Sequence, residues 1–371
     1  MQRLRDDVFI AGMELHRAFI DVAAKPLRHN LGALMNIFTS QTLPDQQKQA
    51  LLPHLWSSLF LVIPLVSTTF ASVNRMLGKL PLNSLGWLLV DEAGQALPQA
   101  VVGALLRTQR AVIVGDPIQI EPVVILPSTL TGAICRRFGV DPDVYAAPTA
   151  SVQTLADAAS SYVTEIEGKQ GSRNVGVPLL VHRRCSEPMF GISNVVAYSN
   201  LMISTKQPKP SAIREALGSS KWIHVEGGRT EDKWSEEEGN VVIHLLLQMA
   251  EARVKPDVYI ITPFVIVADH LRQKIREDKT LLAWINEDLW LWTSERVGTV
   301  HTVQGREAEA VIFVLGSPLP SQTGARGWAG GRPNLLNVAV TRAKEVLYVV
   351  GNRRLWKDSG LFRELDRRLE L

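Results

Sequence analysis

Two acidic and polar strings follow short apolar runs in this chain of 371 residues, at 85–90 and at 111–114. Asp91, directly after the first run, is suited to hold a Mg²⁺ ion on a nucleotide phosphate. Glu92 is suited to orient or deprotonate a water molecule that attacks this phosphate. Gln119, just after the second run, is a neutral donor that could sense a terminal phosphate. The two strings therefore predict chemistry on a nucleotide.

The apolar runs that position these side chains are typical of strands buried on both faces of a parallel sheet. Such runs occupy residues 59–66, 85–90 and 111–114, and each ends in polar residues. Residues 99–106 suit a crossover helix between the last two runs, which is the alternation of a βαβ unit. Because the carboxyl ends of parallel strands meet at one edge, we expect the polar residues to line a crevice there.

The segments before and after these runs differ from them in amino-acid composition and in hydrophobic pattern. Residues 4–55 carry apolar side chains at helical spacing, and residues 127–177 are rich in Pro, Gly, Ser and Ala. Ser235 with its three following glutamates predicts the start of a helix, and residues 318–333 are predicted to be a loop. Further strands are predicted at residues 223–225, 258–261, 310–315 and 346–350.

Composition limits the class of protein. The net charge of +3 and the 46% hydrophobic content are those of an ordinary globular chain. The net charge is too small to indicate a nucleic-acid-binding protein by itself. Two cysteines, Cys135 and Cys185, exclude a disulfide framework and favour a reducing compartment. The run at 59–66 is too short to cross a membrane, and no export signal is evident. We therefore expect a cytoplasmic protein without a membrane partner.

An ordered series of strings supports a more specific prediction. Besides Asp91-Glu92-Ala93-Gly94-Gln95, the strings in chain order are Ser67-Thr68-Thr69, Gly115-Asp116-Pro117-Ile118-Gln119, His182-Arg183-Arg184-Cys185, Ile261-Thr262-Pro263-Phe264, Gly298 to Glu307, and Asn337-Val338-Ala339-Val340-Thr341-Arg342-Ala343-Lys344. From about residue 59 to residue 352 the series resembles the motifs of superfamily 1 helicases, in the branch of the nonsense-mediated-decay helicase and its bacterial relatives. The last string is the most specific, and the order of the whole series makes chance implausible.

The resemblance implies an ATP-dependent motor that moves on single-stranded DNA or RNA. It implies that Asp91, Glu92 and Gln119 act at Mg²⁺ and ATP, that Arg342 is an arginine finger, and that Arg184 is a second such arginine. The residues that it places near the nucleotide, or in the coupling of hydrolysis to movement, are Gly115, Asp116, Gln304, Gly305 and Glu307. Those that it places at the nucleic-acid backbone are Ser67, Thr68, Thr262, Pro263 and Thr302.

Each assignment has a structural alternative. Asp91 and Glu92 could be solubilising acids at a strand end, and Arg183 with Arg184 could be a solvated basic pair. Five tryptophans could stack on bases or belong to the core: Trp87, Trp222, Trp284, Trp290 and Trp292.

The series departs from the family pattern in one large respect. No Gly-x-x-x-x-Gly-Lys-Ser/Thr string, the P-loop that cradles nucleotide phosphates, occurs in the sequence. We therefore expect the isolated chain to be inactive unless an upstream segment or a partner chain supplies a P-loop. The alternative is a non-catalytic nucleic-acid-binding or regulatory fragment.

The predicted fold is α/β, with two RecA-like domains of the P-loop-NTPase type, each built on a parallel sheet. The first is expected to be incomplete and to follow a helical segment. The expected divisions are a helical insertion or remnant at 1–57, the partial first domain at 58–128, a linker region at 129–177 and the second domain at 178–371.

Overall fold

The computed structural model describes residues 1–40, 46–116, 118–119, 121–168, 171–285, 288–303 and 305–369. The chain forms two compact units. Unit 1 comprises Met1–Gly115 and Pro122–Leu155, and unit 2 comprises Asp116–Glu121 and Ala156–Leu371. Within the described ranges, no helix is long and apolar enough to cross a membrane.

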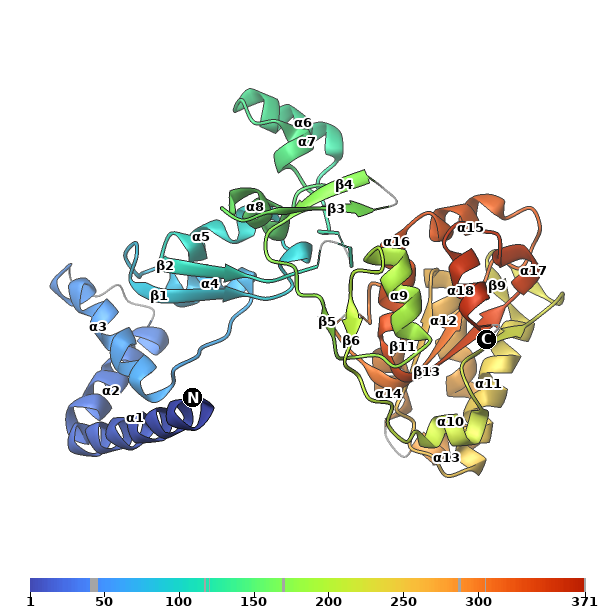
Figure 1. Ribbon diagram of the computed structural model, residues 1–371, viewed down its shortest axis with the longest axis horizontal. Helices are drawn as coiled ribbons and strands as arrows, with labels where there is room; N and C mark the ends of the chain where they lie inside the picture. The colour runs from blue at the N-terminus through green and yellow to red at the C-terminus, as the bar shows by residue number, and fades with distance from the viewer. Residues whose placement is uncertain are drawn as a thin grey trace. The chain divides into compact units, whose positions relative to one another are not determined.

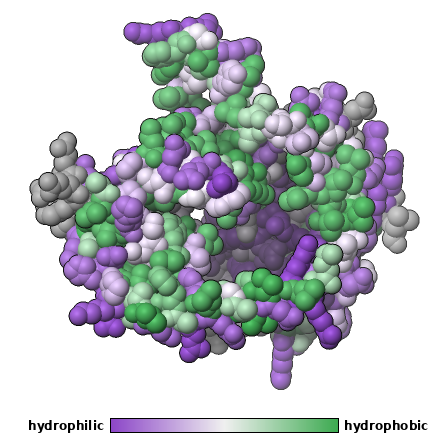
Figure 2. All heavy atoms as spheres, turned by 60° about the vertical axis from the view of Figure 1, so that its left-hand side comes forward, coloured by the Kyte–Doolittle hydropathy of each residue, from purple (hydrophilic) through white to green (hydrophobic). Residues whose placement is uncertain are grey.

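Unit 1 begins with the predicted helical segment (Figure 1). Its helices are α1 (Gln2–Val22), α2 (Ala24–Ser40), α3 (Gln46–Val62) and α4 (Phe70–Leu77). Leu34 of α2 and Trp56 of α3 are buried in one cluster with Leu77 of α4. The described side chains of α1 are not buried, although several are apolar. Figure 2 shows apolar side chains reaching the surface in several patches on this face of the molecule.

The strand predicted at residues 59–66 is wrong. Residues 59–62 form the end of α3, and residues 63–69 belong to no strand. Leu59 and Phe60 pack against the cluster that buries Trp56. These contacts explain why the first residues of the apolar run are helical. A continuous apolar run fits a buried helix as well as a buried strand, and tertiary contacts decide between them.

The parallel pair predicted for unit 1 is confirmed. Strand β1 (Leu85–Val90) pairs in parallel with β2 (Thr108–Ile113), and Val90 lies opposite Ile113. The crossover is a 3₁₀ turn, η2 (Pro98–Ala100), followed by the short helix α5 (Val102–Leu105), rather than one long helix.

The expectation that both faces of these strands are buried is wrong. Leu88 and Val90 pack into the cores of unit 1, whereas Trp87 is 62% and Leu89 is 61% exposed. Successive side chains of a strand point to opposite faces. One face of the β1–β2 pair is therefore covered, and the other presents large apolar side chains to solvent.

The stretch expected to be a linker contains regular elements. They are α6 (Ser128–Arg137), α7 (Pro142–Tyr145), α8 (Val152–Ala159) and the antiparallel hairpin of β3 (Thr164–Gly168) and β4 (Gly171–Val175). Unit 2 then adds a short parallel pair, β5 (Val181–His182) and β6 (Ile203–Ser204).

Unit 2 is built on a five-stranded parallel sheet in the order β11-β10-β12-β13-β7. Its strands are β7 (Lys221–His224), β10 (Val258–Thr262), β11 (Val297–Thr299), β12 (Ala308–Val314) and β13 (Ala343–Gly351). The four strands predicted for this part of the chain are confirmed to within three residues at their ends. This sheet, the two-stranded sheet of unit 1 and the N-terminal helices give the predicted mixed α/β class.

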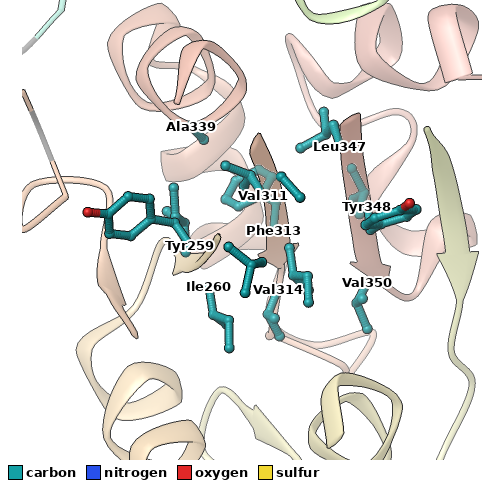
Figure 3. Packing of buried hydrophobic residues seen from close by; sticks show 14 of the residues in the cluster. Tyr259, Ile260, Val311, Phe313, Val314, Ala339, Leu347, Tyr348 and Val350 are labelled. Atoms are coloured by element: carbon teal, nitrogen blue, oxygen red, sulfur yellow. The ribbon is translucent and has the colours of Figure 1, made fainter. Parts of the chain in front are cut away.

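The core of unit 2 lies around β12 and β13. Val311, Phe313 and Val314 in β12 and Tyr348 and Val350 in β13 have no exposed surface, and Figure 3 shows their close packing. Because consecutive strand residues alternate between faces, their complete burial means that both faces of the sheet are covered. Among the helices that contact the sheet are α9 (Met189–Ala197), α11 (Glu236–Glu251), α12 (Val265–Glu277) and α16 (Pro333–Thr341).

The loop predicted at residues 318–333 is wrong, because it contains helix α15 (Thr323–Gly330). Three glycines in this helix give it poor intrinsic propensity. Contacts of the buried Arg326 stabilise the helix despite this low propensity. Its side chain is 3% exposed and donates hydrogen bonds to the carbonyls of Ser317, Leu319 and Pro320. Tertiary contacts thus override a sequence that favours a loop.

Helix α11 begins where the sequence predicts, since the Oγ of Ser235 accepts a hydrogen bond from the N–H of Glu238. The Glu238 carboxylate does not return to this cap. Its Oε2 instead accepts a hydrogen bond from the Gly316 N–H at 2.8 Å, beyond the end of β12. Glu238 is 1% exposed, and burial raises its pKa to about 8.

This buried carboxyl group predicts an unusual pH dependence. Between about pH 4.5 and about pH 8, Glu238 keeps its proton in the folded chain and loses it in the unfolded chain, so the free energy of unfolding falls as the pH rises. A Glu238→Gln variant has no carboxyl group to titrate and lacks this pH dependence. As the pH rises from about 4.5 to about 8, we therefore expect its free energy of unfolding to increase relative to that of the native chain, by on the order of a few kcal/mol. Urea unfolding at about pH 5 and about pH 8.5 measures the difference. An equal difference in unfolding free energy between the variant and the native chain at both pH values would contradict the raised pKa of Glu238.

Candidate functional site

The acidic turn after β1 has a defined geometry. The Oδ1 of Asp91 accepts a hydrogen bond from the Glu92 N–H at 2.9 Å, and Glu92 adopts a left-handed backbone conformation with φ of 53°. The Nε2 of Gln95 donates to the Oε2 of Glu92 at 2.8 Å. Asp91 itself is exposed at the strand end. The turn therefore presents one accessible carboxylate beside a second that a neighbouring amide orients.

A close backbone contact joins this turn to the end of β2. The Ala93 N–H donates to the Val114 carbonyl at 3.0 Å. A Cβ atom at Gly115 would lie 2.5 Å from the Gly94 nitrogen, closer than atoms can approach. Only glycine permits this contact, so the structure brings the first polar string and the start of the second together.

Asp116 and Gln119, the rest of the second string, belong to unit 2. The Oδ1 of Asp116 accepts the Ile118 N–H at 2.9 Å, and the Nε2 of Gln119 donates to its Oδ2 at 3.3 Å. The hydroxyl of Tyr198, next to the end of α9, also donates to this Oδ2. Gln119 is thus turned back onto Asp116.

The Tyr198 hydroxyl connects Asp116 to helix α16. It accepts a hydrogen bond from the Nδ2 of Asn337 at 3.0 Å, and the Oδ1 of Asn337 accepts the Ser193 hydroxyl at 2.7 Å. Burial, and then the negative charge of Asp116, raise the pKa of Tyr198, so the phenol remains a donor. Nothing in the spacing of Tyr198 signals this role, because its partners are 82 and 139 positions away.

A charged cluster lies at the amino edge of the unit 2 sheet. Glu307 immediately precedes β12, and its carboxylate contacts the Nζ of Lys344 at 2.9 Å and the Nε of Arg184 at 3.2 Å. The hydrogen bond from Lys344 is the largest influence that lowers the pKa of Glu307. The three side chains are about 40% exposed. The structure thus brings together Arg184 and Glu307, which are separate candidates in the sequence. Lys344, the last residue of the last string and without an assigned role, joins them.

Arg342 lies at the same edge, directly before β13, but its side chain is only 1% exposed. Its Nη1 donates to the Arg306 carbonyl at 3.1 Å. The nearby Cys185 thiol contacts the Thr341 carbonyl, and burial raises its pKa to about 12, so this cysteine is a neutral packing residue. The guanidinium thus sits behind the backbone at Arg306 and beside the exposed cluster.

The opposite, carboxyl edge of the sheet holds the predicted backbone contacts of unit 2. Thr262 is the last residue of β10 and is fully buried, with its Oγ1 accepting the Phe264 N–H at 3.4 Å. Pro263 is buried as well. Thr302 is exposed, and its hydroxyl donates to the Thr299 carbonyl at 2.9 Å. Of these three residues, Thr302 is the one that can meet a ligand directly.

One segment connects the two edges. It leaves β11 at Thr299 on the carboxyl edge and enters β12 at Ala308 on the amino edge. Gly305, with φ of 74°, and Glu307 lie on it. Gln304, predicted to take part in coupling, lies outside the described residues.

Two predicted residues of unit 1 stand apart from any strand. Ser67 and Thr68 are exposed in the segment between α3 and α4, and the Thr68 hydroxyl bonds only locally, to the Thr69 carbonyl at 3.4 Å. The described residues contain no group of three or more potential metal ligands. The carboxylate of Asp91 offers the oxygen ligands that a Mg²⁺ ion prefers.

Comparisons with known proteins cover most of the chain. Residues 171–354 match the model of a family described as an AAA domain, and residues 45–127 match a second model described in the same words. The chain is 22% identical over 309 residues to an uncharacterized ATP-dependent helicase of Methanocaldococcus jannaschii, which covers 76% of this chain and 38% of that protein.

The chain is also 24% identical over 295 residues to the DNA replication ATP-dependent helicase/nuclease DNA2 of Gallus gallus, which covers 78% of this chain and 25% of that protein. It therefore spans well under half the length of these curated relatives. Among solved structures, the PRRSV helicase matches with a TM-score of 0.32 and 15% identity, over 72% of this chain and 36% of that chain.

Proposed function

Because the chain belongs to the superfamily 1 helicases, we propose that it is the motor portion of an ATP-dependent helicase or translocase that moves on single-stranded DNA or RNA. The observation that carries this proposal is the charged cluster of Arg184, Glu307 and Lys344 beside Arg342. Cations at the amino edge of such a sheet can stabilise the charge that develops on a transferred phosphoryl group.

Asp91 and Glu92 of unit 1, and Asp116, Gln119 and Tyr198 of unit 2, are the other residues to which we assign a role. Asp91 would hold the Mg²⁺ ion that accompanies ATP, and such an ion would supply positive charge at the phosphates. Glu92, oriented by Gln95, directs the attacking water. Asp116 and Gln119 respond to the terminal phosphate, and Tyr198 carries that response to α16 through Asn337. Arg184 is exposed enough to exchange Glu307 for a phosphate oxygen.

The phosphate cradle comes from elsewhere. The sequence contains no P-loop string, and one face of the β1–β2 sheet presents Trp87 and Leu89 to solvent. A further strand and helix carrying a P-loop, from an upstream segment or a partner chain, would cover such a face. The need for this partner follows from the proposed motor.

A second candidate function is a non-catalytic nucleic-acid-binding or regulatory chain, which the missing P-loop string favours. Binding of a single strand that is indifferent to ATP supports this candidate. A complete lack of binding at low salt, where phosphate contacts are strongest, excludes it.

Hydrolysis of Mg·ATP by the purified chain tests the proposal. It is measured without nucleic acid, with single-stranded DNA and with single-stranded RNA, against a Glu92→Gln variant that keeps the shape of the side chain. Turnover that a strand stimulates and that vanishes in Glu92→Gln supports a complete site. Absence of turnover directs the assay to the chain combined with a segment that carries a P-loop. If this combination is also silent, the motor proposal fails.

A further inference from the structure

Trp328 on helix α15 is a large aromatic side chain that is not buried in the core. It is 41% exposed, whereas its neighbours Arg326 and Ala329 on the same helix are buried. Its ring lies 6.0 Å from the ring of Phe264, centroid to centroid, at an interplanar angle of 34°. Phe264 is only 8% exposed, so it supports Trp328 from below. The pair forms a partly open aromatic surface.

Two cations accompany this surface. The guanidinium of Arg332 lies 5.5 Å from the centre of the Trp328 ring, and the Nζ of Lys233 lies 5.7 Å from the centre of the Phe264 ring. Lys233 pairs with the adjacent Asp232. Arg332 is exposed and forms no ion pair with any carboxylate in the described parts of the chain. Its charge is therefore available to an anionic ligand.

The surface lies at the carboxyl edge of the unit 2 sheet. Phe264 is the second residue after β10, and the Ser317 N–H beyond β12 donates to the Lys233 carbonyl at 2.8 Å. Thr302 follows β11, the strand next to β10. The aromatic surface is therefore at the same edge of the sheet as the exposed threonine that the sequence predicts to contact a nucleic-acid backbone.

The surface is also held in place. Arg326 fixes α15 to the preceding loop through three carbonyls. At the other end of the helix, the Gly330 carbonyl accepts the Leu361 N–H at 2.9 Å, and a Cβ at Gly330 would lie 2.1 Å from the Ser359 oxygen. Two residues beyond Arg326, Trp328 is therefore presented by a helix that is anchored at both ends. A site that is ordered in advance loses little entropy when it binds.

We propose that Trp328, supported by Phe264, stacks on a base of single-stranded nucleic acid while Arg332 binds a neighbouring phosphate. The inference rests on the proposed function, because it names a contact of that same strand. An open aromatic face fits a base without regard to its sequence, and a cation that no carboxylate neutralises fits the charge of the backbone. The ligand is a DNA or an RNA strand, since both carry these groups.

Fluorescence anisotropy with labelled oligo(dT) and oligo(U) tests the proposal on the full chain. We expect Trp328→Ala to weaken binding by about 5- to 150-fold, the effect of about one stacked base. Trp328→Phe keeps an aromatic face and should stay within about threefold of the native chain. The matched control is Tyr162→Ala, since Tyr162 is an aromatic side chain of unit 2 that is 82% exposed and is assigned no contact with a ligand. This control should bind as the native chain does.

The salt dependence separates the two contributions. Arg332→Ala should reduce the slope of log affinity against log salt by about one, whereas Trp328→Ala should leave the slope unchanged. Unchanged binding in Trp328→Ala would overturn the inference. So would a loss of binding in Trp328→Phe or in Tyr162→Ala as large as that in Trp328→Ala. If the native chain binds but Trp328→Ala binds equally well, only this contact fails. If the native chain binds neither oligonucleotide, the proposed function fails with it. The preferred oligonucleotide identifies DNA or RNA as the stronger ligand.

Discussion

Replacing Arg342 with alanine is expected to lower strand-stimulated ATP hydrolysis by roughly a thousandfold or more, the range found for arginine fingers. The side chain lies at the amino edge of the unit 2 sheet, beside Arg184, Glu307 and Lys344. Lysine keeps the charge but not the planar fork, so Arg342→Lys should also lose most of the activity. Turnover is measured in whichever preparation hydrolyses ATP, the chain alone or the chain combined with its P-loop segment.

The burial of Arg342 makes a structural control necessary. Its guanidinium is 1% exposed and donates to the Arg306 carbonyl, so its removal also costs packing and a hydrogen bond. Urea unfolding of Arg342→Lys shows whether the fold persists when activity is lost. Arg354→Ala is the matched surface variant, since Arg354 is 76% exposed and pairs with Glu226 in the same unit. Native turnover in a folded Arg342→Ala variant would remove this arginine from the mechanism.

Replacing Glu345 with alanine is expected to destabilise unit 2 by about 3 kcal/mol or more. Glu345 is 5% exposed in β13, and its carboxylate accepts hydrogen bonds from the Nζ of Lys206 at 2.6 Å and the hydroxyl of Ser186 at 2.9 Å. The Lys206 side chain is only 10% exposed. Without Glu345, this ammonium group stays buried beside no partner carboxylate, which is the costly outcome for a buried ion pair.

The same carboxylate predicts a loss of stability in acid. Burial alone raises the pKa of Glu345, but the hydrogen bonds from Lys206 and Ser186 outweigh it, and the pKa is lowered. Its stabilising contribution is therefore present above the ordinary glutamate pKa and is lost as the pH falls below that value. Urea unfolding of Glu345→Ala should show a smaller loss at low pH. The exposed Glu215 provides the matched control, and a Glu345→Ala effect no larger than that of Glu215→Ala would refute the expectation.

The sequence predicts those parts of the fold in which local pattern and tertiary packing agree. The strands at 258–261, 310–315 and 346–350 lie in a sheet covered on both faces, so continuous apolar runs identify them. The pattern fails at 59–66, where the same kind of run packs partly as a helix. It fails again at 318–333, where glycines mask a helix that buried contacts of one arginine hold in place.

The candidate site is less accessible to sequence reasoning. The family resemblance points to Arg184, Glu307 and Arg342 singly. It does not show that they meet at the edge opposite to the one that Thr262 and Thr302 occupy. The strand directions and pairings decide this, and neither is local information. Tyr198 and Trp328 carry no motif, since their partners come from distant parts of the chain. Lys344 had a weak signal, as a second cation two residues beyond Arg342.

The segment between Thr299 and Ala308 has a mechanical consequence. It is short, and it is tied at one end to the carboxyl edge of the sheet and at the other to the amino edge. Arg306, on this segment, also accepts the hydrogen bond of Arg342. A long, flexible loop would accommodate a movement of either end without moving the other. A connection of only eight residues between two strands of the sheet has little spare length. It can therefore act as a lever with its pivot near Gly305, where the backbone already adopts a left-handed conformation. In the proposed motor, stiffening this pivot would leave both ends intact and yet uncouple ATP hydrolysis from movement along the strand.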